Sequence, residues 1–385
     1  MIKESSLAWG LDRAVRHLNH GSFGAVPQFA LDRQAEYRAL MEGAPVRWFV
    51  GVPQRIADAR ARVAPYLGVP VDDLAFVPNA SAGASVVFTS LPVEHGCEIV
   101  VTDHGYGAVT MGAQRLARRW GGTVRTAHVP LAAGPQEACA AITAEFSDRT
   151  ALVVLDHVTS PTARFLPVDL VSAAARERGI PVLVDGAHVP LVLEEPLAGV
   201  DCDVWVGNLH KFGCAPRGTG VLVARGPVRS ELNPLVDSWG AGKPFPAAFD
   251  EQGTQDFTSW LAAPDALDVV EREIGWKAVR HNAADLVERG AQVVARAFTA
   301  ATGEDHRVDV GMPAVPFRLV RLPRGLVLGG HELRDRVLAE FDVEAAFTAF
   351  GDDAFVRLAA HAYNTLDDYE DFAARVVPAL LEWSH

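Results

Sequence analysis

The sequence has few cysteines, no long apolar run and no excess of positive charge. Its four cysteines, Cys97, Cys139, Cys202 and Cys214, stand far apart, which excludes a disulfide scaffold and a CxxC zinc motif. No stretch reaches the roughly 18 consecutive apolar residues of a membrane span. The early charges in residues 1–12 do not match a signal peptide. We therefore expect a cytoplasmic protein without a membrane partner.

Acidic residues outnumber basic ones, 48 to 35, and the formal net charge is -13 over 385 residues. A nucleic-acid-binding protein usually has the opposite balance, so we expect no nucleic-acid partner. The sequence also lacks an HExxH or HxH cluster, a GxGxxG motif after its first expected strand and a GxSxG motif. These absences argue against a metalloenzyme, a nicotinamide dehydrogenase and a serine hydrolase.

What the sequence does contain is an alternation of short apolar runs with helical patterns. We expect strands at Leu74–Val77, Glu98–Thr102, Thr123–Val129, Ala151–Leu155, Pro181–Val184, Val204–Val206 and Gly220–Val223. The helical patterns between or before them cover 54–67, 80–90, 108–120, 135–146 and 170–178. This alternation predicts an α/β fold with a mostly parallel sheet whose two faces are covered by helices.

The pattern changes after residue 257. We expect helices at 260–274, 276–300, 332–341 and 366–383, and strands near 315–320 and 355–359. The chain is therefore expected to have a large domain over 15–257 and a smaller C-terminal α+β domain over 258–385. Residues 1–14 are expected to pack at the active-site side. The Gly- and Pro-rich stretch 239–249 is the best candidate for a mobile loop.

Polar side chains follow five of the expected strands. The segments are Asn79–Ser81, Asp103–Tyr106, Asp156–Ser160, Asp185–His188 and Asn208–Lys211. Ligands of open α/β sheets bind at the carboxyl ends of the strands. These residues therefore predict a site at one edge of the sheet.

Lys211 is the most informative of these residues. It is either an ordinary loop lysine or an amine that forms a Schiff base after burial has lowered its pKa. Asp185 ends a strand 26 residues earlier, and it is either a helix N-cap or the carboxylate that a pyridoxal phosphate ring nitrogen requires. Asn79, Ala80 and Ser81 open a helix, which suits either a phosphate site or a simple cap.

Six segments along the chain give these residues a context. They are His17–Gly24, Asp103–Ala108, Asp185–His188, Asn208–Lys211, Gly253–Asp256 and Arg357–Asn364. In this order they resemble class V of the fold-type I pyridoxal-phosphate enzymes, and within it the isopenicillin N epimerase-like group. The resemblance implies a large, mostly parallel seven-stranded α/β/α sandwich domain with a smaller C-terminal α+β domain. It also implies pyridoxal 5'-phosphate as cofactor and a homodimer with a shared active site.

The resemblance assigns a role to each matching residue of the cofactor site. It implies that Lys211 forms the Schiff base and that Asp185 keeps the pyridine nitrogen protonated. It places His188 at the ring hydroxyl and Tyr106 in a stack on the ring. The other cofactor contacts that it implies are Ala80, Ser81, Asn208 and His210 at the phosphate, Ser160 near the ring, and Thr254 from the other subunit.

On the substrate side, the resemblance implies that Arg357 binds the α-carboxylate of an amino acid and that Asn19 and His20 line the pocket. A bidentate arginine suits this task better than a lysine. Arg47 either reaches the substrate or stacks on an aromatic side chain.

The expected reaction begins with removal of the Cα proton of an amino acid held as an external aldimine, with Lys211 as base. Reprotonation on the opposite face would make the protein an epimerase or racemase, which is the preferred prediction. Loss of a β-substituent would make it a Cβ–S lyase acting on cysteine conjugates or sulfoxides. Reprotonation on the cofactor would make it an aminotransferase. Tyr106, His20 or His104 is the candidate second acid or base. His104 and His157 also follow expected strands. Each is either a site residue or a histidine that packs or caps within the protein.

Two further classes are disfavoured. A cysteine desulfurase uses a mobile cysteine shortly before the carboxylate-binding arginine, and no cysteine occurs between Phe341 and Arg357. A catalytically inactive scaffold would be expected to lose Lys211 or Asp185, and both are present.

Overall fold

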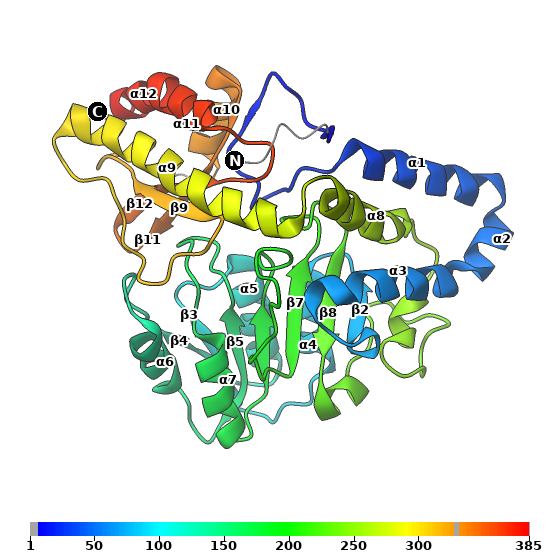
Figure 1. The fold of residues 1–385 in the computed structure, drawn as a ribbon. Coiled ribbons are helices and arrows are strands. Elements are labelled where there is room, and N and C mark those ends of the chain that lie inside the picture. The colour runs from blue at the N-terminus through cyan, green and yellow to red at the C-terminus, as the bar shows by residue number, and fades with distance from the viewer. Residues whose placement is uncertain (1–6, 327–330, 385) are drawn as a thin grey trace.

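The computed structural model describes residues 7–326 and 331–384 and is built around a seven-stranded sheet (Figure 1). The strands are β2 (Leu74–Val77), β3 (Glu98–Thr102), β4 (Thr123–Ala127), β5 (Thr150–Asp156), β6 (Val182–Asp185), β7 (Val204–Asn208) and β8 (Gly220–Ala224). Their spatial order is β2-β8-β7-β6-β5-β3-β4. Only β8 runs antiparallel to its neighbours in this sheet. The predicted α/β fold with a mostly parallel sheet is confirmed.

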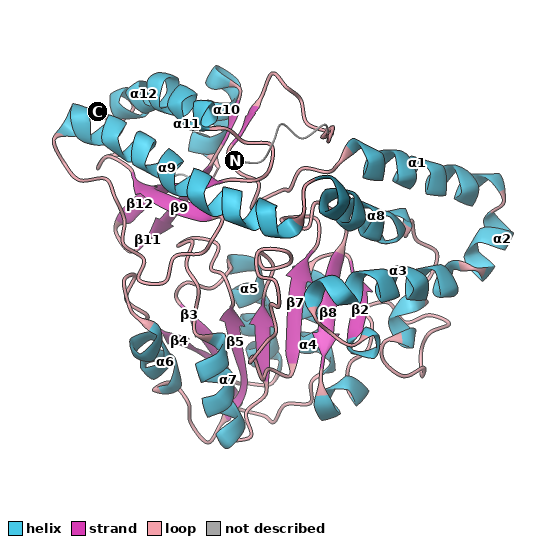
Figure 2. Ribbon diagram, in the orientation of Figure 1, coloured by secondary structure: helices cyan, strands magenta, loops and turns pink. Residues whose placement is uncertain are grey.

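Helices cover both faces of this sheet, so each face has its own apolar core (Figure 2). The first core includes residues of α3 (Val52–Leu67), α6 (Pro135–Thr143), α7 (Val168–Glu177) and α8 (Thr258–Glu273). The second includes residues of α4 (Ala80–Ser90) and α5 (Gly107–Arg119). Trp205 of β7 belongs to the first core, and Val204 and Val206 belong to the second. Strands buried on both faces explain why the sequence shows continuous apolar runs.

A smaller antiparallel sheet follows in the C-terminal part of the chain. It consists of β9 (Phe317–Arg321), β11 (Ala346–Phe350) and β12 (Asp353–Ala359), in the order β11-β12-β9. The surrounding helices are α9 (Trp276–Thr302), α10 (Glu332–Phe341), α11 (Leu366–Asp371) and α12 (Val377–Glu382). This part has a separate core. β11 was not predicted, and a π-helical turn at Phe372–Val376 interrupts the expected helix over 366–383.

The expected domain boundary between residues 257 and 258 stays a prediction. α8 begins at Thr258, but it packs against α3 and against α1 (Gln28–Gly43). Its Trp260 and Leu261 lie in the first core of the large sheet. α9 packs instead against β9 and β12. The packing partner of the chain therefore changes between α8 and α9.

The N-terminal residues lie beside the C-terminal part. β1 (Arg16–His17) pairs in parallel with β10 (Val343–Glu344), and the rings of Trp9 and His361 have centroids 5.6 Å apart. Residues 1–6 of the expected N-terminal segment lie outside the described residues.

The remaining elements are α2 (Pro45–Val50) and short turns of 3-10 helix at Val71–Asp73, Gly226–Ser230 and Ala247–Asp250. Within the described ranges, every helix is too short or too polar to cross a membrane.

Candidate active site

The carboxyl ends of β5, β6 and β7 meet a cavity of about 930 Å³ that also touches the C-terminal sheet. Most residues predicted for the site line this cavity. They are Asn19, Ala80, Ser81, Tyr106, Ser160, Asp185, His188, Asn208, His210, Lys211 and Arg357. The topology of the parallel sheet brings these residues together from segments more than 300 positions apart in the chain.

Lys211 lies in the turn after β7, and its Nζ is 3.0 Å from Nε2 of His188. His188 Nδ1 faces the carbonyl oxygen of Val158 at 3.4 Å, which favours a proton on Nδ1 and leaves Nε2 free to accept a Lys211 N–H. Burial lowers the pKa of Lys211 to about 8, although the carboxylate of Asp185 opposes this shift. Burial lowers the pKa of His188 well below its usual range. The lowered pKa makes the unprotonated amine, which is the form that acts as a nucleophile or base, more accessible near neutral pH than in an ordinary lysine.

Two buried carboxyl groups end neighbouring strands at the cavity. Asp156 of β5 and Asp185 of β6 are register partners, so their side chains leave the same face of the sheet. Asp185 accepts the N–H of Ala187 at 2.9 Å, and Asp156 accepts the N–H of Tyr106 at 3.2 Å. Burial raises the pKa of both carboxyls, and the charge of Asp185 raises the pKa of Asp156 further. Asp156 is therefore the harder of the two carboxyls to ionise.

In the sequence, Asp156 is recognisable only as a residue at a strand end, with no role assigned to it. The structure places it in the cavity wall beside Asp185. The available signal was the parallel pairing of two strands that both end in aspartate. That signal requires knowing which strands are neighbours.

The N-terminus of α4 forms another part of the wall. The Asn79 side chain caps the helix by accepting the N–H of Ala82 at 2.8 Å, and Asn208 Oδ1 accepts the N–H of Ala80 at 2.8 Å. The Ala80 N–H is therefore already bonded to protein, which differs from the expectation that it and Asn208 both contact a phosphate. Ser81 lines the cavity at the same end, where the helix dipole favours an anion.

Tyr106, Ser160 and His210 reach the cavity from loops. Tyr106 is the N-cap residue of α5 and is 43% exposed. His210 Nδ1 donates to the carbonyl of Thr219 at 2.8 Å, and burial lowers the pKa of His210 to about 4, so the ring is neutral. Ser160 accepts hydrogen bonds from Arg357. Each lies where the sequence placed it, at the carboxyl end of a strand.

Arg357 of β12 is a buried guanidinium in the cavity wall. One terminal nitrogen donates to the Ser160 carbonyl at 2.7 Å and to its hydroxyl at 3.1 Å. The other donates to Asn19 Oδ1 at 3.2 Å and to Ser22 Oγ at 3.1 Å. Nε has no partner among the described residues, and burial lowers the pKa of Arg357 to about 10. Since its described partners are all neutral, Arg357 is suited to bind the carboxylate of a ligand.

Three predicted site residues do not line this cavity within the described ranges. His20 is 1% exposed and lies behind Lys211, where its ring stacks on His361 with centroids 4.0 Å apart. Arg47 is exposed on α2, and Thr254 is exposed in the loop before α8. The expected contact of Thr254 through a second subunit stays a prediction.

His104 and His157 are both buried and packed away from the cavity wall. His104 Nδ1 is 2.7 Å from Thr162 Oγ1, and its Nε2 is 2.8 Å from the Val129 carbonyl. Burial lowers the pKa of His157 to about 4. Of the two interpretations left open by the sequence, the packed one fits both residues.

This set of side chains fits pyridoxal phosphate. The group needs an amine for its aldehyde, a carboxylate for its ring nitrogen and donors for its phosphate. Lys211, Asp185 and the α4 terminus with Ser81 offer these around one cavity. Arg357, with its neutral partners and an unbonded Nε, leaves a place for an acidic substrate group.

Known proteins resemble the chain over nearly its full length. Residues 25–305 match the family model described as aminotransferase class V. The chain is 32% identical over 383 residues to isopenicillin N epimerase from Streptomyces clavuligerus, with 94% of each protein covered. It is 26% identical to putative L-cysteine desulfhydrase 1 from Oryza sativa subsp. japonica, with 93% of this chain and 82% of that protein covered.

Solved structures share the fold. The complex of the cystine C–S lyase C-DES with its product cysteine persulfide has a TM-score of 0.80 to this chain. The sequence identity is 22%, and the match covers 94% of this chain and 97% of that one. At this identity the likeness concerns the fold alone.

Proposed function

The chain belongs to the class-V aminotransferase family, and from this premise we propose that it is an epimerase-type enzyme that inverts the Cα of an amino-acid substrate. Its cofactor is pyridoxal 5'-phosphate. The observation that carries the proposal is one cavity holding the Lys211 amine, 3.0 Å from His188, together with Arg357, whose described partners are neutral. Lys211 supplies a base, and Arg357 supplies a binding site for a carboxylate.

When bound, pyridoxal phosphate supplies an electron-withdrawing ring that makes the Cα proton of an amino acid acidic. We assign Lys211 to its aldehyde carbon, Asp185 to its ring nitrogen and Ser81 with the α4 terminus to its phosphate. Asp185 stabilises positive charge at the ring nitrogen by its own negative charge. The neutral His210 can accept a hydrogen bond at Nε2 in this region.

The substrate is oriented by Arg357, whose planar guanidinium binds a carboxylate through two parallel hydrogen bonds. Lys211 Nζ then takes the Cα proton, which its lowered pKa allows near neutral pH. His188 Nε2 accepts a Lys211 N–H and holds the amine in place. Inversion also needs a group that returns a proton from the other side, and we propose Tyr106, whose side chain is accessible at the cavity.

A Cβ–S lyase is the second candidate. The relatives named L-cysteine desulfhydrase favour it, and the same Lys211 would remove the same proton. A desulfurase with a mobile cysteine is not proposed, because none of the described cysteines lines the cavity. We also propose a homodimer and a cytoplasmic location.

The test is to incubate the protein and pyridoxal phosphate with a panel of amino acids in deuterated water. Epimerisation predicts deuterium at Cα and both configurations of an otherwise intact substrate. A lyase would release pyruvate with a thiol or persulfide, and an aminotransferase would release a 2-oxo acid. Lys211→Ala is the control, and it should abolish deuterium entry. If the parent protein, like Lys211→Ala, exchanges no Cα hydrogen of any amino acid for deuterium, the proposal is wrong.

A further inference from the structure

A group of polar side chains, all buried except the partly exposed Tyr363, lies behind the backbone of Lys211. We call it the His20 cluster, and it consists of His20, Cys214, His361 and Tyr363. The rings of His20 and His361 are stacked at 4.0 Å with an interplanar angle of 3°. Cys214 Sγ is 3.9 Å from His20 Nε2 and 3.5 Å from His361 Nε2. His20 was expected to touch substrate, but it does not line the cavity within the described ranges.

The hydrogen bonds of His20 fix its tautomer. Nε2 lies 3.0 Å from the carbonyl oxygen of Lys211, which can only accept, so Nε2 carries the proton. Nδ1 must then accept, and both groups near it can donate. These are the Tyr363 hydroxyl at 3.0 Å and the Ala25 N–H at 3.3 Å. The neutral ring is thus satisfied at both nitrogens, and burial with the neighbouring His361 lowers the pKa of His20 well below its usual range.

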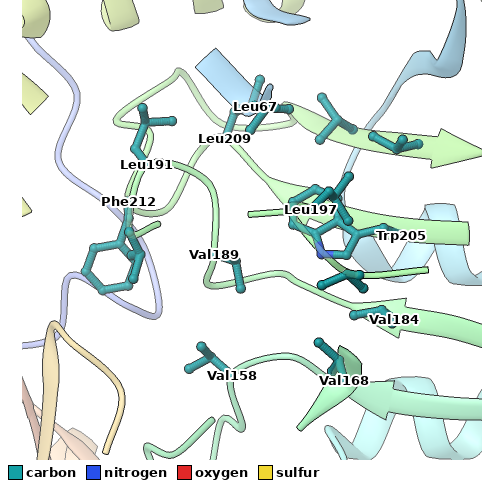
Figure 3. Close-up of a cluster of buried hydrophobic side chains, with 14 of the residues drawn as sticks. Leu67, Val158, Val168, Val184, Val189, Leu191, Leu197, Trp205, Leu209 and Phe212 are labelled. Carbon is teal, nitrogen blue, oxygen red and sulfur yellow. The ribbon is translucent and has the colours of Figure 1, made fainter. Parts of the chain in front are cut away.

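The segment that carries His20 also approaches the Lys211 turn at Gly24. A side chain at Gly24 would overlap the Lys211 carbonyl group, so only glycine permits this approach. The Gly24 N–H donates to the carbonyl of His210 at 3.1 Å. On either side of Lys211, Leu209 and Phe212 are anchored in the first core (Figure 3). The Lys211 carbonyl also accepts the N–H of Cys214 at 3.0 Å. The lysine backbone is therefore held by its own turn, by the N-terminal segment and by the core.

We propose that His20 is a positioning residue for Lys211, which it holds by donating from Nε2 to the lysine carbonyl. Through this bond the N-terminal segment fixes where the Lys211 amine meets the cofactor aldehyde. The inference rests on the proposed function, since it concerns the lysine that binds the cofactor. It replaces the expected direct contact of His20 with substrate by a contact with the protein backbone.

A metal ion is the competing explanation, because ligand atoms of His20, Cys214 and His361 lie within 4.8 Å of one another. The ring geometry argues against it. A metal lies near the plane of each histidine that binds it, and one ion cannot lie in two parallel planes separated by a ring stack. The His20 nitrogen nearest the sulfur is also already bonded to the Lys211 carbonyl.

The experiment measures covalent capture of pyridoxal phosphate by the cofactor-free protein. Condensation of the Lys211 amine with the aldehyde releases water, and borohydride then reduces the C=N bond to a stable amine. Peptide mass spectrometry identifies the modified lysine, and the rate is followed by quenching at intervals. The proteins compared are the parent, His20→Leu, His20→Gln and Cys214→Ala, each checked for folding by circular dichroism.

His20→Leu should slow capture at Lys211 about tenfold, as expected for loss of one buried hydrogen bond. His20→Gln places an amide N–H near the position of Nε2 and should restore the rate to within about twofold of the parent. Cys214→Ala should leave the rate unchanged, since the sulfur does not contact Lys211. Should His20→Leu fail to fold, Tyr363→Phe, which removes the donor to Nδ1, is expected to slow capture about threefold.

Two results would overturn the positioning role. The first is a folded His20→Leu protein, or a folded Tyr363→Phe protein in its place, that captures the cofactor as fast as the parent. The second is equal loss in His20→Leu and Cys214→Ala together with stoichiometric zinc in the parent, which would establish a metal site. A parent protein that captures no cofactor would instead contradict the proposed function itself.

Discussion

At the scale of single residues, Lys211 and Arg357 are two basic side chains at one cavity. Within the described part of the chain, neither lies within hydrogen-bond distance of a carboxylate: Lys211 Nζ contacts His188, and Arg357 donates to Ser160, Asn19 and Ser22. Removing a cation from water without a bonded counter-ion destabilises the folded state. Buried basic groups without a counter-ion are retained where function requires them. Replacing such a residue is therefore expected to stabilise the protein and to lower its activity.

Lys211→Met should therefore stabilise the cofactor-free protein by roughly 1 kcal/mol near neutral pH while abolishing cofactor capture. Burial lowers the pKa of Lys211 from 10.5 to about 8. Between these values the unfolded chain binds more protons, so this residue makes the parent more stable as pH rises from 8 to 10.5. Urea unfolding across this range should show that rise reduced in the variant. An identical pH dependence in both proteins would contradict the assignment.

Arg357→Lys should raise the KM for the amino-acid substrate about 100-fold, because lysine keeps the charge but loses the planar pair of donors. Steady-state kinetics on the substrate found in the exchange experiment give the value. Arg47→Ala tests the alternative assignment, and it should alter KM much less than Arg357→Lys does if Arg357 binds the carboxylate. If the two variants behave in the opposite way, the carboxylate site is at Arg47.

At the scale of elements, the pairing of β5 with β6 creates the site feature that the sequence did not reveal. Both strands end in aspartate, and their register places Asp156 beside Asp185. Two buried carboxyls this close do not both ionise easily. Asp156 therefore makes the folded protein sensitive to pH.

Asp156→Asn should stabilise the cofactor-free protein by about 1 kcal/mol near pH 7. Since the pKa of Asp156 is raised above 3.8 in the folded protein, its stabilising effect is present at low pH and is lost as pH rises through that raised value. The amide still accepts the Tyr106 N–H but cannot ionise. Thermal unfolding at several pH values should show a weaker decline above about pH 4 in Asp156→Asn. A variant with the parent's pH dependence would mean that Asp156 is ionised.

The strands of the large sheet could be predicted from sequence to within about two residues. They are buried on both faces, and a buried strand is a continuous apolar run. β11 and α1 cannot be predicted in the same way, because few of their side chains are buried. Only Ala346 is buried in β11, and only Ala30 and Met41 are buried in α1, so neither shows a clear apolar period.

At the scale of the whole molecule, several large apolar side chains are exposed on a single chain. Trp239 is 91% exposed, Val50 is 80%, Val46 is 79% and Phe23 is 67%. Val46 and Val50 lie on α2, at the far right of Figure 1, and Phe23 lines the cavity. Adjacent exposed apolar groups are typical of surfaces that another protein covers, and Val46 and Val50 are four residues apart on one helix. We therefore place α2 at the interface of the proposed homodimer, whose shared active site stays a prediction.

Light scattering should therefore give a mass twice the 41.3 kDa of the chain. Val46→Asp combined with Val50→Asp should weaken the dimer by about 100-fold or more, since charges would be buried at the interface. Leu170→Asp on α7, where Leu170 is 37% exposed, is the control for a surface charge. A monomeric parent would rule out the role of Thr254 across the subunits.

The sequence by itself determined the α/β fold, the large-sheet strands and the placement of Lys211, Asp185 and His188 at one edge, because apolar runs and strand ends are local patterns. It also brought in the family, which implied Arg357. The tertiary structure alone decided that Asp156 stands beside Asp185 and that His20 lies behind Lys211. Both depend on which segments become neighbours, and contacts between distant segments leave no local pattern in the chain.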